Sequence, residues 1–377
     1  MENQKEYPKY RNQVLFVYIV IAMIAVFIGQ TIFESAPALF KNRIWGYALG
    51  CIAGGYIINV MIYELGKIIF GKFAKFHLVA SDMIFLSFKR NNKGKVKGKF
   101  NLSFAGHTIM APSSSDAKNK LYLLGGGILT FIFNIALIVA GILLAEHLEI
   151  EEIKYCSFMV AAVGLFIMIL NLSPFLSDEI NDGFTLRLIA NEESKKAFHH
   201  NLLQEEVLLT GKGELSPLLL DEYHNHIKAK TLIYNYYYYI DNGLTKEARD
   251  IVNLTLEYKD YLLEEDHIKA YANKLFFDLL TCENEEKISE EYYAYEKEIR
   301  KGASNHTNFE TIKSALLVAV LIDSSYDFYE YLTTKIDKKK DLYKYELRKD
   351  KEDQLIEKAL TRIQEKKPDW FKPYEEE

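Results

Sequence analysis

Four long apolar runs without a charged residue lie in the first half of the chain, and a charged, polar sequence follows them. The runs cover residues 14–33, 44–63, 121–145 and 155–177. A helix rises about 1.5 Å per residue, so about 20 residues cross the roughly 30 Å hydrocarbon layer of a membrane. Each run is long enough to do so, and the pattern predicts an integral membrane protein with four transmembrane helices.

The first run has two interpretations. Ala36-Pro37-Ala38, just after it, resembles the small-residue site at which a signal peptide is cleaved. The apolar region of a signal peptide is usually about 7–15 residues long. The run at residues 14–33 is longer, which favours an uncleaved anchor.

The charges of the connecting loops predict the orientation of the spans. Basic residues gather before the first run and between the second and third runs, whereas the loop between the third and fourth runs is acidic. Loops rich in Lys and Arg stay in the cytoplasm. Both termini are therefore expected there. A composition rich in Phe, Tyr and Lys and poor in Pro favours the cell membrane of a bacterium.

Charge and cysteine content narrow the classes of function. The net charge is −6, and no basic stripe lies outside the loops that flank the membrane, so no nucleic-acid partner is expected. The loop lysines are expected to set the topology and to contact anionic lipid of the bilayer. Cys51, Cys156 and Cys282 lack the spacing of metal ligands, and the sequence predicts no disulfide framework.

A β-hairpin is predicted beside the membrane, between the second and third runs. Residues 83–88 and 96–104 are rich in apolar and aromatic side chains, and Asn91-Asn92-Lys93-Gly94 between them has the composition of a turn. His77 and His107 flank this hairpin.

Residues 191–367 have a helical pattern with a single proline. Residues 229–258 predict two helices, the first ended by Gly243 and the second capped by Thr245. Tyr236–Tyr239 are expected to be packing aromatics, and further amphipathic segments cover residues 266–280, 289–300 and 311–332. Stacked helical hairpins of the tetratricopeptide type fit this pattern. The expected division is a cytoplasmic N-terminus at 1–13, a membrane domain at 14–190, a cytoplasmic all-α domain at 191–367 and a loose tail at 368–377.

Polar residues at the ends of two runs indicate a buried site. The second run ends in Tyr63-Glu64-Leu65-Gly66-Lys67, and the fourth continues through Asn171-Leu172-Ser173-Pro174 to Asn181-Asp182-Gly183. A proline disturbs a helix, and backbone groups that it frees within a membrane need protein or water as partners. The acids that follow the proline, Asp178, Glu179 and Asp182, suggest a polar site and not plain anchoring.

These motifs resemble those of the site-2 protease family of intramembrane zinc metalloproteases, peptidase family M50. That family carries H-E-x-x-H on one core helix and, after an N-x-x-P turn, an Asp in a D-G pair on a later helix. The resemblance covers about residues 44–190. It implies that Glu64 occupies the general-base position and that Tyr63, Lys67 and Asp182 occupy the zinc-ligand positions. It also implies a substrate groove, with candidate residues Asn171, Pro174, Asn181, Gly183 and His107.

The two replaced histidines decide which chemistry the resemblance allows. Positions i and i+4 share one face of a helix, as two zinc ligands must. A lysine ammonium has no lone pair for a metal, and a tyrosine must first lose a proton of pKa about 10. Only Asp182 is a ready ligand, so no cofactor is expected. His77 and His107 are the nearest histidines, but neither is on the ligand face.

Lys67 then has two interpretations. Its ammonium group either stands in for the metal, pairing with Asp182, Glu64 or both while Tyr63 hydrogen-bonds the same carboxylates, or it extends to the membrane interface.

Three functions remain open. The first is an inactive pseudoprotease that binds or regulates a membrane protein or peptide, with a cytoplasmic protein as a further partner of the helical domain. The second is an active intramembrane metalloendopeptidase with a non-standard site, which would need zinc. The third is a small membrane transport or immunity-type protein in which the motif is accidental. Contact between residues 63–67 and Asp182 argues against the third, and metal content separates the first two.

Overall fold

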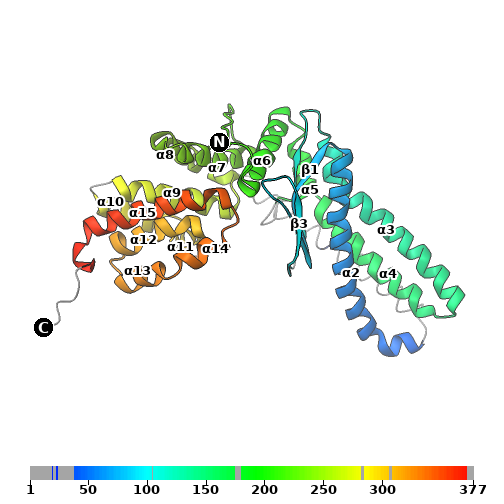
Figure 1. Ribbon diagram of the computed structural model, residues 1–377. Coiled ribbons are helices and arrows are strands. Elements are labelled where there is room, and N and C mark those ends of the chain that lie inside the picture. Colours follow the sequence, from blue (N-terminus) through cyan, green and yellow to red (C-terminus); the bar gives the residue numbers. More distant parts are fainter. Residues whose placement is uncertain are drawn as a thin grey trace. The chain divides into compact units, whose positions relative to one another are not determined.

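A computed structural model describes residues 19, 23, 38–103, 105–174, 180–281, 284–304 and 308–371, with the side chains of 38–45 and 371 left out. The chain divides into two compact units, Met1–Lys195 and Lys196–Glu377 (Figure 1). Each unit is described by itself below.

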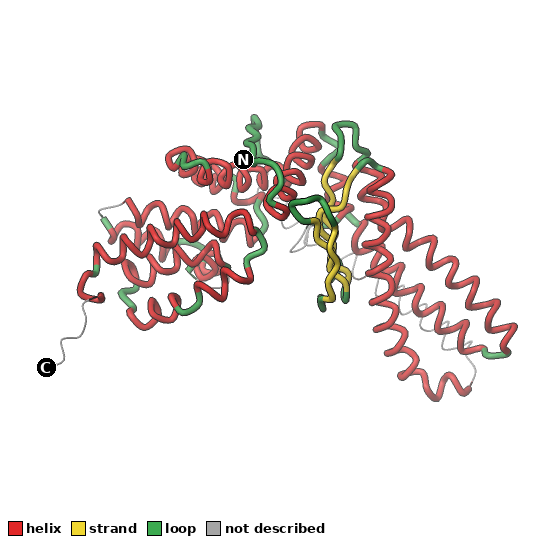
Figure 2. Tube along the Cα trace, viewed as in Figure 1, coloured by secondary structure: helices red, strands yellow, loops and turns green. Residues whose placement is uncertain are grey.

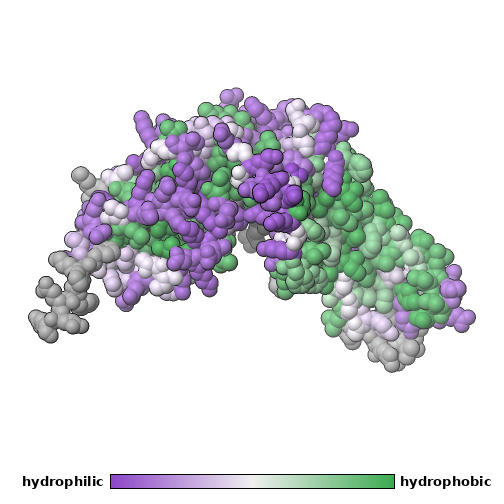
Figure 3. Space-filling model, viewed as in Figure 1, coloured by the Kyte–Doolittle hydropathy of each residue, from purple (hydrophilic) through white to green (hydrophobic). Residues whose placement is uncertain are grey.

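Three helices of the first unit are long and apolar enough to cross a membrane. They are α2 (Ala38–Phe73), of which Gly46–Phe73 meets this criterion, α3 (Asn119–Leu148) and α4 (Glu151–Leu172). The face of these helices that is visible in Figure 3 is mostly hydrophobic, whereas hydrophilic residues predominate on the visible face of the second unit. The predicted span at residues 14–33 lies outside the described residues, apart from Ile19 and Met23.

Two of the predicted spans end elsewhere than the charge pattern indicates. Helix α2 does not stop at Tyr63 but continues for ten more residues, to Phe73. It can do so because Glu64 is buried inside the protein and therefore does not face lipid. Helix α4 ends at Leu172, short of the predicted 177, because Pro174 disfavours the helical conformation of the preceding residue, Ser173, which is extended.

A polar contact in the apolar layer ties the three helices together. Asn134 of α3 donates to the side-chain oxygen of Asn59 on α2 at 2.7 Å. Asn59 in turn donates to the Val160 carbonyl of α4 at 3.1 Å. Such hydrogen bonds support helix association in lipid, where apolar contact alone does not distinguish a helix from its surroundings.

The predicted hairpin is present as part of a four-stranded antiparallel sheet, drawn as arrows in Figure 1 and in yellow in Figure 2. The strands are β1 (Phe76–Met83), β2 (Leu86–Arg90), β3 (Val96–Phe100) and β4 (His107–Pro112), in the order β3-β2-β1-β4. The prediction missed β1 and β4, and its first strand, 83–88, falls across the β1–β2 turn. The error is physical: Ile84 in that turn packs against Val60 and Tyr63, so its apolar character reflects burial against α2.

The second unit is helical, as predicted. Its α-helices are, in chain order, α6 (Glu192–Thr210, which starts in the first unit), α7 (His226–Asp241), α8 (Thr245–Glu257), α9 (Glu264–Thr281), α10 (Glu285–Ala294), α11 (Lys297–Ala303), α12 (Ile312–Leu317), α13 (Tyr326–Thr333), α14 (Ile336–Leu342) and α15 (Lys349–Lys366). Short helical turns lie between them: η1 (Lys259–Tyr261), η2 (Phe309–Thr311), η3 (Val318–Ile322), η4 (Glu346–Arg348) and η5 (Pro368–Phe371).

Several local predictions in this unit can be scored. The turn after α7 is confirmed, with Gly243 at φ +76°. Thr245 is wrong as a cap, because it is the first residue of α8 and the preceding Leu244 makes no side-chain cap bond. Segment 289–300 is divided between α10 and α11, and segment 311–332 is interrupted before α13, where Ser324 has φ +49°.

Tyr236 and Tyr237 are packing aromatics, as predicted. Both are buried, and their hydroxyl groups donate to Asn273 and Glu310. Trp370 of the predicted loose tail packs 5.2 Å from the Tyr326 ring, measured between centroids, whereas residues 372–377 lie outside the described part.

We expect the second unit to lose stability as the pH falls from about 6.5 to about 4. Burial lowers the pKa of His200 and of His226 to about 4, from about 6.5 in an unfolded chain. Between these values the unfolded chain binds more protons than the folded one, so stability falls as the pH is lowered. Urea unfolding followed by Trp370 fluorescence, in a Trp45→Phe background, measures the effect. His200→Gln should flatten the dependence, and His224→Gln, at an exposed position, should not; a midpoint that is equal at pH 7 and pH 5 contradicts the prediction.

Candidate functional site

Two side chains of α2 converge on one carboxylate. The Lys67 ammonium lies 3.0 Å from Asp182 Oδ1, and the Tyr63 hydroxyl donates to Asp182 Oδ2 at 2.8 Å. Tyr63 and Lys67 are one helical turn apart on the same face of α2, as the i, i+4 spacing requires. The side chains of Lys67 and Asp182 are only 12% and 10% exposed. The contact that the sequence left open is therefore present, and Lys67 does not extend away to the interface.

Helix α3 closes the site from another direction. A Cβ atom at Gly126 would lie 2.6 Å from the Tyr63 ring, so the glycine leaves the space in which that ring fits. The Lys67 ammonium also lies 5.6 Å from the centre of the Tyr122 ring, within the range of a cation–π contact. Tyr122 was not identified from the sequence, where nothing marks it; the Gly125-Gly126-Gly127 run was a usable signal of close helix packing.

Asn181 determines where Asp182 lies. Helix α5 (Asp182–Leu188) begins at Asp182, and the Asn181 side chain accepts a hydrogen bond from the Phe184 amide at 2.8 Å. The same side chain donates to the carbonyl groups of Leu170 and Ser173, at 3.0 and 2.8 Å. It thus gives partners to carbonyl groups that the end of α4 frees, and it joins α4 to α5. Asn181 holds Asp182 in place.

Glu64 faces the sheet and is close enough to Lys67 and Asp182 to interact with both electrostatically. It is 6% exposed, and its Oε2 has no hydrogen-bond partner among the described residues. A Cβ atom at Gly106 would lie 2.6 Å from the Glu64 side chain, so the segment that leads into β4 covers it. His107 follows at the start of β4 and is exposed. The main chain at Gly106 and His107 is therefore the part of the sheet next to the general-base position.

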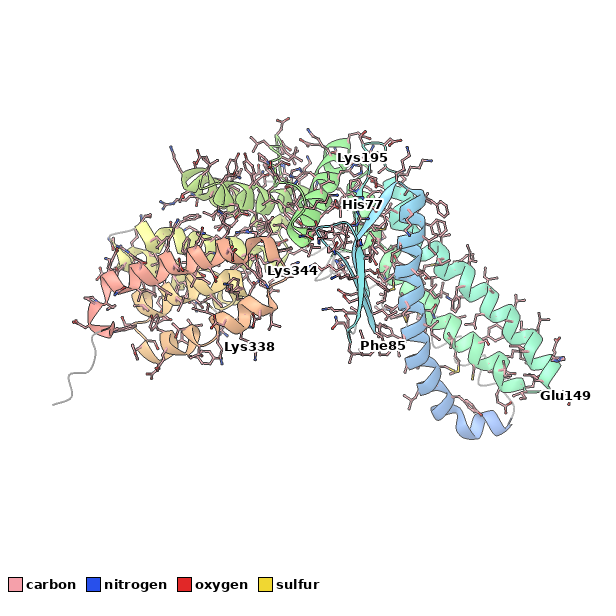
Figure 4. The ribbon with its side chains drawn as sticks, viewed as in Figure 1. His77, Phe85, Glu149, Lys195, Lys338 and Lys344 are labelled. Atoms are coloured by element: carbon pink, nitrogen blue, oxygen red, sulfur yellow. The ribbon has the colours of Figure 1, made fainter. Side chains whose placement is uncertain are left out.

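His77 is remote from this site. It pairs through Nδ1 with Ser113 Oγ at 3.0 Å. In Figure 4, His77 lies at the upper end of the sheet, near the end of α2, and Phe85 lies at the opposite end, which packs beside Val60 and Tyr63. His77 is therefore placed away from the ligand face, as expected.

The other expected groove residues differ in how exposed they are. Asn171 donates to the Ile167 carbonyl of its own helix at 2.9 Å, and Gly183 is buried directly against the Leu172 carbonyl. Pro174 is exposed. Asp178 and Glu179 lie outside the described residues. Of the expected groove residues that are described, Pro174 and His107 are thus the exposed ones.

These donors do not fit a zinc ion. Three protein ligands with free lone pairs are needed, and Asp182 is the one such group of the three. Its two oxygens accept hydrogen bonds from Tyr63 and Lys67, which occupy the positions where the family resemblance implies nitrogen ligands. Within the described ranges, no group of three or more His, Cys, Asp or Glu side chains is placed to hold a metal ion. The arrangement pairs a buried cation with a buried carboxylate and joins α2 to α5. It does not provide the ligands that would hold a metal ion and activate a water molecule.

We expect Gly126→Val to disturb this site strongly. The new side chain would occupy the space of the Tyr63 ring, and overpacking of this kind costs about 1–3 kcal/mol. Unfolding in mild detergent by SDS titration measures the loss. A replacement of Gly50, which has open space around it, with valine is the control. Equal effects of the two valines would contradict the packing described for Tyr63.

Comparisons with protein-family models, with curated proteins and with solved structures gave no match. The resemblance to site-2 proteases therefore stays a hypothesis that rests on the motif residues.

Proposed function

We propose that the protein is a site-2 protease-like pseudoprotease, in which a lysine ammonium takes the place of the catalytic metal. One observation carries the proposal: Tyr63 and Lys67, at the two histidine positions of the motif, both bind the carboxylate of Asp182, at the third ligand position. Residues 63 and 182 are far apart in the sequence, and their contact supports a shared ancestral site. It argues against an accidental match.

Charge explains why such a site stays folded without zinc. Removing a dication would leave Asp182 as an unpaired acid inside the membrane unit, which is costly. The Lys67 ammonium supplies one positive charge, and the Tyr63 hydroxyl supplies a second hydrogen bond. The buried Glu64 lies next to this pair and interacts electrostatically with the Lys67 ammonium. An active metalloprotease remains the alternative, but the donors around Asp182 do not favour it.

The proposed role is to bind a membrane protein or peptide without cutting it. Pro174 and His107 are exposed at the ends of segments that lead to Asp182 and Glu64, which makes them candidates for contact with such a partner. The helical unit would bind a cytoplasmic protein, as stacked helical hairpins of the tetratricopeptide type do. This proposal includes four spans with both termini in the cytoplasm.

Site-specific photocrosslinking in cells tests the proposed role. A photoreactive amino acid is placed at Pro174 or His107, and at Leu143, an exposed position on α3, as the control. We expect the first two positions to capture the same membrane polypeptide at full length, unchanged in a Glu64→Gln background. A product that is shortened only when Glu64 is intact would support the active protease. Identical products at Leu143, or none at Pro174 and His107, would contradict a groove.

A further inference from the structure

Helices α2 and α4 run in the same direction, side by side and in matching register. A Cβ atom at Gly55 of α2 would lie 3.3 Å from the Cα atom of Val160 on α4. One turn further along, Asn59 donates to the Val160 carbonyl, and Gly164 leaves the space that the Asn59 side chain fills. Gly55 thus faces Val160, and Asn59 faces Gly164.

The same register, one turn in the other direction, places Cys51 opposite Cys156. The two thiol groups are within hydrogen-bond reach of each other. Both cysteines are free and half-buried. Tyr47 and Met159 pack around Tyr155 beside them, so this end of the helix pair is ordered by contacts of its own. The sequence alone did not indicate this pair, because it depends on the register of α2 against α4.

The pair lies at the end of the helices that is remote from Asp182. Glu149, labelled in Figure 4, marks the turn between α3 and α4 at that end. Cys156 is five residues from the start of α4 at Glu151, a rise of about 8 Å. The thiols are therefore near the boundary of the apolar layer, where a polar reagent reaches them more easily than at mid-depth.

We propose that Cys51 and Cys156 are a redox pair, which forms a reversible disulfide that links α2 to α4. The proposal does not depend on the pseudoprotease role, although it uses the same orientation of the spans. Disulfide geometry needs Cα atoms about 4.4–6.8 Å apart, and the close approach at Gly55, one turn away, holds the two backbones near each other. The orientation that the loop charges predict puts this end outside the cytoplasm, where disulfides persist.

The reaction is thiol–disulfide exchange with an oxidant that is itself a disulfide. The thiolate of one cysteine attacks a sulfur atom of the oxidant, forms a mixed disulfide and releases one oxidant thiol. The sulfur of the second cysteine attacks the mixed disulfide, and the second oxidant thiol leaves as the Cys51–Cys156 bond forms. Two electrons reduce the oxidant, and the two protons end on its thiols.

The link would join the helix that carries Tyr63 and Lys67 to the helix that leads to Asp182. It would do so at the end of the helices that is remote from Tyr63, Lys67 and Asp182, so the contacts of these three residues would not change. The expected consequence is a more stable helix pair when the cysteines are oxidised, because the cross-link limits how far the unfolded chain can separate.

Oxidised glutathione, applied to the full chain in mild detergent, is the probe. Cys282→Ser removes the third cysteine. We expect both thiols to become resistant to maleimide, with an intact mass lower by two hydrogen atoms, and the thermal midpoint to rise; a reductant should reverse all three changes. The control is Cys156→Ser/Phe158→Cys, which moves the thiol by two residues to another face of α4.

The possible results divide clearly. Thiol protection in the Cys51/Cys156 protein, together with maleimide labelling in the control, supports the proposal. Thiols that both stay reactive, or that carry glutathione without closing the ring, would overturn it. Equal ring closure in the control would overturn it as well, because the register of α2 and α4 would then not select the pair.

Discussion

Replacing Lys67 with alanine is expected to lower the free energy of unfolding of the first unit, Met1–Lys195, by about 3–5 kcal/mol. The substitution leaves the Asp182 carboxylate buried, with the Tyr63 hydroxyl as its remaining side-chain donor among the described residues. An uncompensated charge in this position is the main cost. Titration from mild detergent into SDS, followed by Trp45 fluorescence in a Trp370→Phe background, measures the change. Lys72→Ala, an exposed position on the same helix, is the control and should cost little.

A double-mutant cycle then separates pairing from packing. Asp182→Asn removes the negative charge but keeps an oxygen that accepts the Tyr63 hydrogen bond. Combined with Lys67→Ala, it should recover part of the loss, and the two substitutions should be coupled. Strictly additive effects would mean that the Lys67–Asp182 pair contributes nothing as a pair, and replacement of the metal by an ammonium would have to be abandoned.

Replacing Glu352 with glutamine is expected to destabilise the second unit, Lys196–Glu377, by a similar amount, about 3–5 kcal/mol. Glu352 accepts from Lys313 at 2.7 Å and from Arg348 at 2.6 Å, and all three residues have an exposed fraction of 0%. The substitution leaves Lys313 and Arg348 in the core without the carboxylate that they share. Asp241 stays 3.4 Å from Arg348, and the buried Glu310 interacts electrostatically with both cations. These contacts hold α15 against α12, so urea unfolding followed by Trp370 fluorescence in a Trp45→Phe background reports the loss.

Two further variants test the cause of that loss. Lys313→Met/Glu352→Gln removes one charge of each sign and should recover part of the stability, since Arg348 keeps Asp241 as a partner. Glu296→Gln breaks an exposed pair with Lys259 and should cost less than about 1 kcal/mol. A loss at Glu352 no larger than that at Glu296 would contradict the importance of this buried cluster.

Sequence reasoning reached the members of the site but not their surroundings. The spacing of Tyr63 and Lys67, together with the family resemblance, gave contact with Asp182 as one of two interpretations, and the structure has that contact. The roles of Asn181 and Tyr122 were not predictable in the same way. They depend on where α4 ends and on how α3 packs against α2, and these are tertiary properties that no local pattern carries.

The fold was predictable where one physical requirement dominates. Membrane-length apolar runs identified α2, α3 and α4, and a polar turn identified the β2–β3 hairpin. The first predicted strand was placed across the β1–β2 turn because Ile84 in that turn is buried against α2, which gives it an apolar character that resembles strand sequence. Strand β4 was missed as well. The break before α13 follows from a positive φ at Ser324, a residue type that does not by itself indicate such a conformation.

Metal analysis of the purified protein tests most directly whether Lys67 has replaced the metal. We predict that the wild-type chain, washed with a mild chelator, holds no stoichiometric zinc, because Asp182 is its single ready ligand. The Tyr63→His/Lys67→His variant restores two nitrogen ligands on the face of α2 that contacts Asp182 and should bind about one zinc ion per chain. Adding Asp182→Ala should greatly reduce the bound zinc. About one zinc ion per wild-type chain, abolished by Asp182→Ala, would contradict the replacement of the metal by Lys67.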